Sequence, residues 1–202
     1  MGLATGTIAG TKALVLAASY SGERAFEIYV TSSEARTVWS AALAAVEAEG
    51  GVAYGLEALE ILRIEKGHVE TGGEIDGRTS AHDLRLEKML NPRGGYIGEA
   101  GMNRPFFQDP QRLQLVGLES LEGPIPEGSM LVEKTGDAAQ GHVTGSGLRT
   151  LQSGFIALGL LQGGRSREGE TLTCWSGVRK QAVRARIVAP HFYDPQGALY
   201  RD

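Results

Sequence analysis

Six short β-rich runs in the second half of the chain restrict the possible folds more than any other feature of the sequence. Clusters of Gly, Pro, Ser and Asp separate the runs, which cover residues 112–118, 130–133, 140–145, 154–161, 171–175 and 181–187. Short strands at this spacing, with turn residues between them, are typical of an antiparallel barrel or sandwich. We therefore expect residues 104–202 to form an all-β domain.

The first half differs, because helical periodicity alternates there with strand patterns. Residues 12–19 and 25–30 are interpreted as two strands of a hairpin around the turn SGER. Thr31, with Glu34 three residues later, has the spacing of a capping box and predicts the start of a helix. The apolar face of that helix comprises Val38, Trp39, Ala42, Leu43 and Val46.

Two more helices are expected in this half. The first covers residues 55–66, stops at Gly67, and has a buried side made of Leu56, Leu59, Ile61 and Leu62. A shorter one follows Ser80 and ends by Asn91, because a residue before proline disfavours the helical conformation. The whole pattern predicts an α+β fold. A mixed α/β layer in residues 1–103 precedes a small antiparallel β-barrel or sandwich in residues 104–202, with the boundary near Arg104.

Charge and composition exclude several classes of protein. The 202 residues carry a formal net charge of −4 and scattered arginines, so we expect no nucleic acid partner. The apolar runs are too short to cross a bilayer, and the start MGLATG lacks the features of a signal peptide, which predicts a cytoplasmic protein with no membrane partner. One cysteine and four widely separated histidines provide no set of metal ligands.

The segment TGSGLRTL, residues 144–151, contains a Gly-Ser-Gly sequence. No helical pattern follows it, and no third glycine stands at the spacing of a dinucleotide-binding loop. We interpret this segment as a turn.

The stretch SYSGERAFEIYV, residues 19–30, places a carboxylate among apolar strand residues. Phe26, Ile28 and Val30 alternate with Glu27 and Tyr29, so successive side chains point to opposite faces of a sheet. From these residues alone, Glu27 is interpreted as a charge on the solvent face of a strand. The alternative is a carboxylate held at a binding site.

Three motifs resemble the folate-binding aminomethyltransferase family, typified by the T-protein of glycine cleavage. YSGERAFEIYV, GLEALEILRIEKGH and GGYIGE look like the family's hairpin, helix and aromatic-bearing loop, in the same order and at the same spacing. EALEILRIEKGHVETGGEIDGRTSAHDL and the ending APHFYDPQGALY also resemble the C-terminal part of sarcosine oxidase alpha chains, which carries such a module. The resemblance implies about the latter half of the family's full module.

The resemblance also implies a tetrahydrofolate cavity lined by Tyr20 and Glu27. A pterin presents a ring N–H beside an exocyclic amine, and one ionised carboxylate can accept a hydrogen bond from each. Arg63 is retained from the family's helix. It is either a folate ligand or the partner of Glu60 or Glu65 in a salt bridge that anchors the helix.

Two departures from the family pattern limit what the resemblance implies. Family members of the glycine-cleavage type carry an arginine where this sequence has Leu59, although sarcosine oxidase alpha chains share the departure. The family's catalytic aspartate is expected to lie outside this chain. No residue is therefore assigned a catalytic role.

Three functions are compatible with these features. The first is a tetrahydrofolate-dependent one-carbon transfer module, which collects the methylene group released when an amine such as sarcosine is oxidised by a larger flavoprotein. The second is a non-catalytic binding or assembly domain with a degenerate folate site. The third is an unrelated α+β domain without a ligand. In the first two, flavin and NAD lie on other segments, and the partners are other segments or subunits of an oxidase complex, or a second copy.

Overall fold

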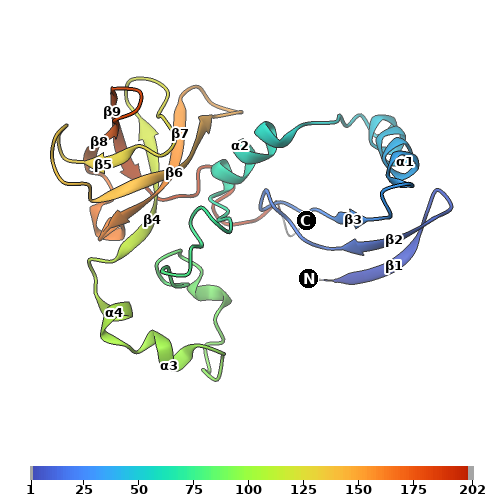
Figure 1. Cartoon of the computed structure of the whole chain (residues 1–202), viewed down its shortest axis with the longest axis horizontal. Coiled ribbons are helices and arrows are strands. Elements are labelled where there is room, and N and C mark those ends of the chain that lie inside the picture. The colour runs from blue at the N-terminus through green and yellow to red at the C-terminus, as the bar shows by residue number, and fades with distance from the viewer. Residues whose placement is uncertain (1, 200–202) are drawn as a thin grey trace.

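The structure, a computed structural model, describes residues 2–199. Met1, the first residue of the first predicted domain, lies outside the described residues. So do residues 200–202, which end the second predicted domain and include Tyr200, the last residue of the segment APHFYDPQGALY. A β-barrel lies at one end of the molecule and a three-stranded sheet with a helix at the other, with a second helix between them (Figure 1). This arrangement confirms the predicted α+β fold. The domain boundary near Arg104 stays a prediction.

The barrel contains all six strands that the sequence predicted. In chain order they are β4 Leu113–Ser120, β5 Met130–Val132, β6 Gly141–Leu148, β7 Phe155–Gln162, β8 Thr171–Ser176 and β9 Gln181–Val188. Every pair of neighbours is antiparallel, and the barrel closes in the order β4-β7-β6-β5-β8-β9. Closure leaves no free strand edge in this domain, which favours a stable, unassociated barrel.

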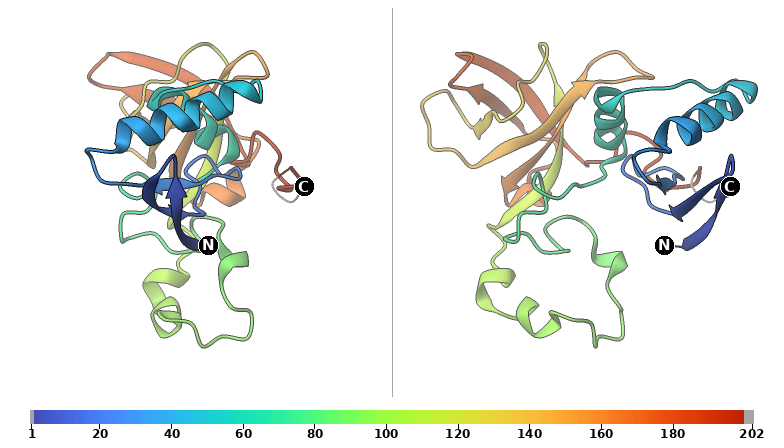
Figure 2. Two further views of the ribbon diagram at one scale, coloured as in Figure 1. Left: turned by 90° about the vertical axis from the view of Figure 1, so that its right-hand side faces the viewer. Right: turned by 45° about the vertical axis from the view of Figure 1, so that its right-hand side comes forward.

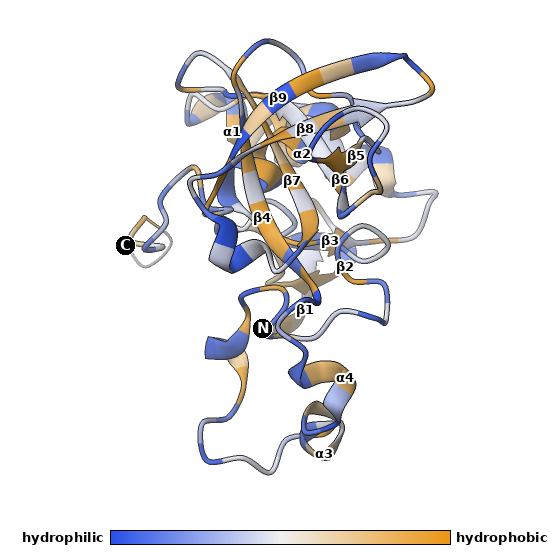
Figure 3. Ribbon diagram, turned by 90° about the vertical axis from the view of Figure 1, so that its left-hand side faces the viewer, coloured by the Kyte–Doolittle hydropathy of each residue, from blue (hydrophilic) through white to orange (hydrophobic). Residues whose placement is uncertain are grey.

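Apolar side chains from alternate strand positions fill the barrel. The buried cluster comprises Val116, Leu118, Ile125, Leu131, Val143, Ala157, Leu161, Leu172, Cys174, Val183, Ala185 and Ile187. The apolar character of β4 and β7 is visible as orange ribbon in Figure 3. A second buried cluster lies on the outside of the barrel and attaches the helix at residues 56–66 to it. It comprises Ile64, Leu84, Leu115, Ile156, Leu158 and Leu160.

Cys174 lies in the barrel core, and burial raises the pKa of its thiol to about 12. Only the thiolate reacts with alkylating agents. We therefore expect iodoacetamide at pH 8 to label the folded protein roughly a thousandfold more slowly than the urea-unfolded chain, as mass spectrometry would measure. Similar labelling rates in the two states would mean that the barrel opens readily around β8.

The segment TGSGLRTL was wrongly interpreted as a turn, because its first half continues strand β6. A Cβ atom at Gly145 would lie 3.0 Å from Nη2 of Arg63, and one at Gly147 would lie 2.9 Å from Cγ1 of Ile61. These glycines therefore allow the helix at residues 56–66 to approach the strand closely.

The N-terminal region contains a sheet of order β1-β2-β3, formed by β1 Leu3–Ile8, β2 Thr11–Leu16 and β3 Glu27–Tyr29. The predicted hairpin is confirmed, because β2 and β3 pair antiparallel, although both strands are shorter than expected. Strand β1 was not predicted. It pairs with β2 along its whole length through the turn at Gly10.

Helix α1, Ala35–Ala48, lies across one face of this sheet (Figure 2). The predicted capping box is wrong in detail. Glu34 is the residue at the N-cap, and Thr31 donates its hydroxyl to the Glu34 carboxylate at 2.8 Å instead of capping backbone N–H groups. Val38 is buried against the sheet, whereas Trp39 is 60% exposed. The predicted apolar face of α1 is therefore only partly covered.

Helix α2, Leu56–Lys66, runs between the sheet and the barrel and ends at Gly67, as predicted. Its buried side was predicted wrongly. Leu56 is 83% exposed and the other predicted apolar residues are half-buried, while Arg63, Ile64 and Glu65 are the buried positions. Arg63 and Glu65 can occupy that side because each bonds to polar groups of other segments, Arg63 to Glu74 and Glu65 to Thr150.

The segment after Ser80 is mostly not helical, contrary to the prediction. It contains a short 3-10 helix, η1 Glu87–Met89. Asp83 accepts hydrogen bonds from the Ser80 N–H at 2.8 Å and from Arg112, and its own carbonyl accepts the N–H of Leu115. The bonds with Arg112 and Leu115 fasten the segment to the start of β4. The remaining short helices are α3 Glu99–Met102, α4 Pro105–Gln108 and the 3-10 helix η2 Gly164–Arg167.

The C-terminal tail after β9 returns to α2. The N–H groups of Phe192 and Tyr193 both donate to the carbonyl of Glu65 at 2.9 Å. The Lys66 ammonium binds the carboxylates of Asp194 at 2.8 Å and of Glu23 at 2.5 Å. The tail and the turn of the β2–β3 hairpin therefore meet at the end of α2. Among residues 2–199, the structure contains no helix with the length and apolarity needed to span a membrane.

Candidate functional site

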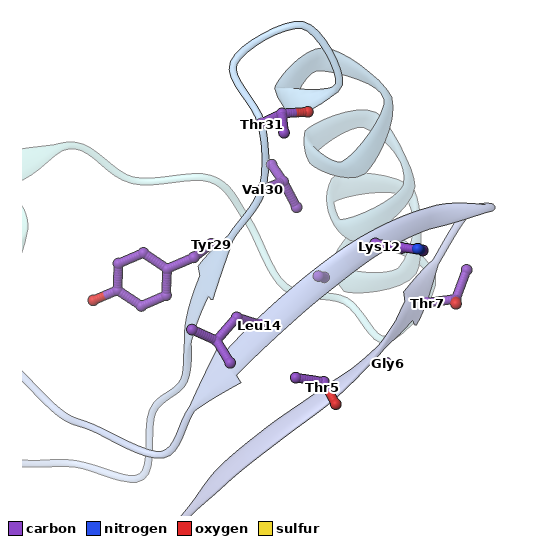
Figure 4. Close-up of a pocket in the computed structure, with 9 residues that line it drawn as sticks. Thr5, Gly6, Thr7, Lys12, Leu14, Tyr29, Val30 and Thr31 are labelled. Carbon is purple, nitrogen blue, oxygen red and sulfur yellow. The ribbon is translucent and has the colours of Figure 1, made fainter.

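Helix α1 partly covers one face of the three-stranded sheet, and the other face is open. Ala13 and Val38 are buried where α1 packs on the covered face. Successive side chains along each strand point to opposite faces of the sheet. Leu14 and Tyr29 are cross-strand partners on the open face. Figure 4 shows these two side chains beside an open groove of about 640 Å³ that also includes residues of β1.

Glu27 lies on the same open face as Tyr29, two residues along β3 and opposite Leu16. Its carboxylate is exposed and accepts the hydroxyl of Tyr29 on Oε2. This hydrogen bond, burial and the charge of Glu27 together raise the pKa of Tyr29. The structure thus places Glu27 on a strand face, as the residues alone indicated. That face is open to solvent and combines apolar side chains with the Glu27 carboxylate.

Tyr20 lies in the connection between β2 and β3 and points toward α2. Its hydroxyl contacts the carboxylates of Glu60, at 3.0 Å, and Glu70. The pKa of Tyr20 is raised by the hydrogen bond to Glu70 first, then by burial and by the hydrogen bond to Glu60. The hydroxyl therefore keeps its proton at neutral pH.

Arg63 is buried beneath Tyr20, with 1% of its side chain exposed. Its Nη2 atom lies 2.5 Å from Glu60 and 3.1 Å from Glu70, and its Nη1 atom lies 3.3 Å from Glu74. Burial alone would lower the pKa of the guanidinium, but the carboxylates of Glu60, Glu74 and Glu70 outweigh it and raise the pKa. Arg63 thus forms the predicted salt bridge with Glu60.

The predicted alternative partner, Glu65, contacts a different residue. Its carboxylate accepts the N–H of Thr150 at 2.6 Å and the hydroxyl of Thr150 at 2.7 Å, so it links α2 to the loop after β6. Of the three predicted site residues, Tyr20 and Arg63 are therefore brought together through two shared carboxylates, while Glu27 lies on the sheet face.

Glu70 and Glu74 were not predicted as site residues. Glu74 is fully buried and accepts hydrogen bonds from Arg63, from the N–H of Glu70 and from the hydroxyl of Thr144. The available signal was a pair of acids on either side of the glycine turn in VETGGEIDG, directly after a helix that contains an arginine. Within residues 2–199, no group of three or more His, Cys, Asp or Glu side chains has the geometry of a metal site.

Comparisons with known proteins agree with this architecture. The GCVT N-terminal domain matches residues 1–94, and the glycine cleavage T-protein C-terminal barrel domain matches residues 114–194. The sarcosine oxidase subunit alpha of Rhizobium meliloti is 37% identical over 185 residues, which cover 88% of this chain and 19% of that protein. The aminomethyltransferase of Desulfitobacterium hafniense is 31% identical over 193 residues, covering 95% of this chain and 52% of that protein.

A solved structure supports the fold. The crystal structure of the glycine cleavage system aminomethyltransferase T from Bartonella henselae has a TM-score of 0.72 at 23% identity and covers 91% of this chain and 50% of that one. The chain spans about a fifth of the length of the sarcosine oxidase alpha subunits and about half of the aminomethyltransferases. The two domain models, the relatives and the fold all agree with the three sequence motifs. The chain therefore belongs to the glycine cleavage T-protein family.

Proposed function

We propose that this chain is the tetrahydrofolate-binding part of a one-carbon transfer module in an amine-oxidising flavoprotein of the sarcosine oxidase type. The observation that carries the proposal is the 37% identity to a sarcosine oxidase subunit alpha across 88% of the chain. Bound tetrahydrofolate would accept the methylene group released by amine oxidation. Flavin and NAD would lie on other segments of the complex, and the complex would work in the cytoplasm.

The residues on the open sheet face fit a pterin. The Glu27 carboxylate has two acceptor oxygens, and Tyr29 uses only Oε2. One ionised carboxylate can accept a ring N–H and an adjacent amine together, which gives two charge-assisted hydrogen bonds. Leu14 and Leu16 flank this position across the strand pair and supply apolar surface for the ring. In this proposal the chain binds and orients folate, and none of its residues is assigned a role in moving protons.

A folate site on this face needs further walls. Ligand pockets bury most of a drug-sized ligand, and the groove beside Leu14 and Tyr29 is open to solvent. Another segment or subunit would therefore cover the open face in the working assembly. Some relatives are subunits of sarcosine oxidase, which agrees with a partner of this kind.

The test of this site is Glu27→Gln. The amide replaces one acceptor oxygen by a donor that faces another donor, while the side-chain volume is kept. We expect folate affinity to fall by about 2–4 kcal/mol, measured by calorimetry on the intact assembly. Tyr20→Phe should cost about 1 kcal/mol, because it removes one neutral hydroxyl.

The isolated chain is the control for this measurement and should bind folate weakly, since its open face lacks walls. Equal affinities of the parent and Glu27→Gln assemblies would return Glu27 to an ordinary strand-face charge. An assembly that binds no folate would favour the assembly-domain function instead.

One observation favours that second function. Strand β3 and helix α1 border an apolar groove of about 580 Å³, lined by Phe26, Ile28, Val30, Ala35, Arg36, Val38, Trp39 and Ala42. Phe26 is 58% exposed, and contiguous apolar surface of this kind usually marks an interaction site. As an assembly domain, the chain would use this groove to contact the rest of an oxidase complex or a second copy.

The exposed apolar groove predicts that the isolated chain associates with itself. We expect the isolated chain to self-associate in sedimentation experiments, and Trp39→Lys to weaken that association at least about tenfold, because buried tryptophans often dominate interfaces. Val178→Lys is the matched control, since Val178 is also exposed but lies in the turn between β8 and β9. A parent chain that stays monomeric at high concentration without a partner would contradict this prediction.

A further inference from the structure

One phenol hydroxyl and one guanidinium nitrogen bridge the same two carboxylates. The Tyr20 hydroxyl contacts Oε2 of Glu60 and Oε2 of Glu70, and Nη2 of Arg63 contacts Oε1 of each. Both carboxylates are partly exposed, whereas Arg63 is buried. The four side chains therefore form a closed clamp with Tyr20 at its outer end.

The inner end of the clamp is fixed in the contact between α2 and the barrel. Nη1 of Arg63 donates to both oxygens of Glu74 and to the carbonyl of His68, each at 3.3 Å. Glu74 also accepts the hydroxyl of Thr144 on β6 and the N–H of Glu70 at 3.0 Å. Side chains with this many buried partners have little rotational freedom, so the two outer carboxylates are held in place.

The count of protons decides what Tyr20 offers to a ligand. Ionised carboxylates only accept hydrogen bonds, and a phenol has one proton to donate. The Tyr20 hydroxyl lies within hydrogen-bonding distance of both Glu60 and Glu70, so its proton is donated to these carboxylates. The lone pairs of the hydroxyl oxygen and the face of the ring remain for any group that binds beside Tyr20.

We infer that Arg63, Glu60 and Glu70 are positioning residues, which hold Tyr20 so that its hydroxyl accepts a hydrogen bond from an N–H or O–H group of the ligand. This inference rests on the proposed function, because it assumes that Tyr20 lines the folate site. Arg63 then acts through the two carboxylates and is not itself a folate ligand. The excess of negative charge around Tyr20 also favours a donor group over an anionic one at this position.

The clamp can be tested on the chain without folate. Tyrosines are replaced by 3-fluorotyrosine, and the resonance of Tyr20, assigned with Tyr20→Phe, is followed by 19F NMR as the pH is raised. Glu70→Gln removes one neighbouring charge, so we expect Tyr20 to ionise about one pH unit or more lower than in the parent. Glu57→Gln, an exposed position on the same helix, should leave this ionisation unchanged. Equal ionisation in the parent and Glu70→Gln would overturn the clamp.

The ligand role of the clamp is tested in the assembly by a double-mutant cycle on folate affinity. Glu70→Gln should weaken folate binding about three- to tenfold in the parent, and should have no further effect in the Tyr20→Phe background. Equal losses in both backgrounds would show that Glu70 acts independently and would overturn positioning. A parent assembly that binds no folate overturns the proposed function and the ligand role of Tyr20 together, while the NMR result decides separately whether the clamp exists.

Discussion

Replacing Arg63 by methionine should lower the free energy of unfolding by about 3–5 kcal/mol, the range for removing one partner from a buried ion pair. Arg63 is the cation that Glu60, Glu70 and Glu74 share, and Glu74 is fully buried. Without the guanidinium, these carboxylates stay close together with no opposing charge. Urea unfolding followed by circular dichroism measures the loss.

Arg184→Met provides the matched control for this change. Arg184 pairs with Glu122 at 2.9 Å on the barrel surface, where the two side chains are 63% and 45% exposed. Exposed pairs contribute about 0–1 kcal/mol, so this variant should unfold at nearly the same urea concentration as the parent. Similar losses from the two arginine variants would mean that the carboxylates around Arg63 find water or another cation when the guanidinium is removed.

Gly67→Ala should cost about 2–5 kcal/mol of unfolding free energy, from strained backbone and overpacking together. Gly67 ends α2 with a φ of +70°, and a Cβ atom there would lie 2.2 Å from the carbonyl oxygen of Pro190. Because the obstacle is backbone, relief requires the C-terminal tail to move away from α2.

Gly50→Ala separates these two causes. Gly50 follows α1 with a φ of +79°, and a Cβ atom there would meet nothing within 4 Å. Its cost should be the backbone strain alone, about 1–2 kcal/mol. Thermal or urea unfolding of both variants gives the difference, and equal costs would show that the tail does not press on Gly67.

The fold was predictable where local signals set the structure. Each barrel strand is a short β-rich run between turn residues, so all six strands could be located from the sequence. Strand β1 was missed because LATGTI is poor in large β-forming residues, and its pairing with β2 is what makes it a strand. The short helix expected after Ser80 was wrong because Asp83 and Arg112, far apart in sequence, bond to each other.

The candidate site was predictable only through resemblance to a family. Tyr20 and Glu27 stand in a motif whose spacing the family shares, whereas Glu27 taken by itself looks like any exposed strand charge. Glu74 could not be recognised, because its importance comes from Arg63 and from Thr144, which is 70 residues away in sequence. Local patterns do not report which charges a fold will bury together.

The return of the tail to α2 affects how the chain can be divided. Residues 190–194 follow the last barrel strand, yet Phe192, Tyr193 and Asp194 bond to Glu65 and Lys66 of the other region. A hybrid made by joining relatives at one point near Arg104 would therefore unite a helix from one parent with a tail shaped for another. Recombination that respects this fold needs two crossovers, so that the tail travels with α2 and the barrel is exchanged as an insert.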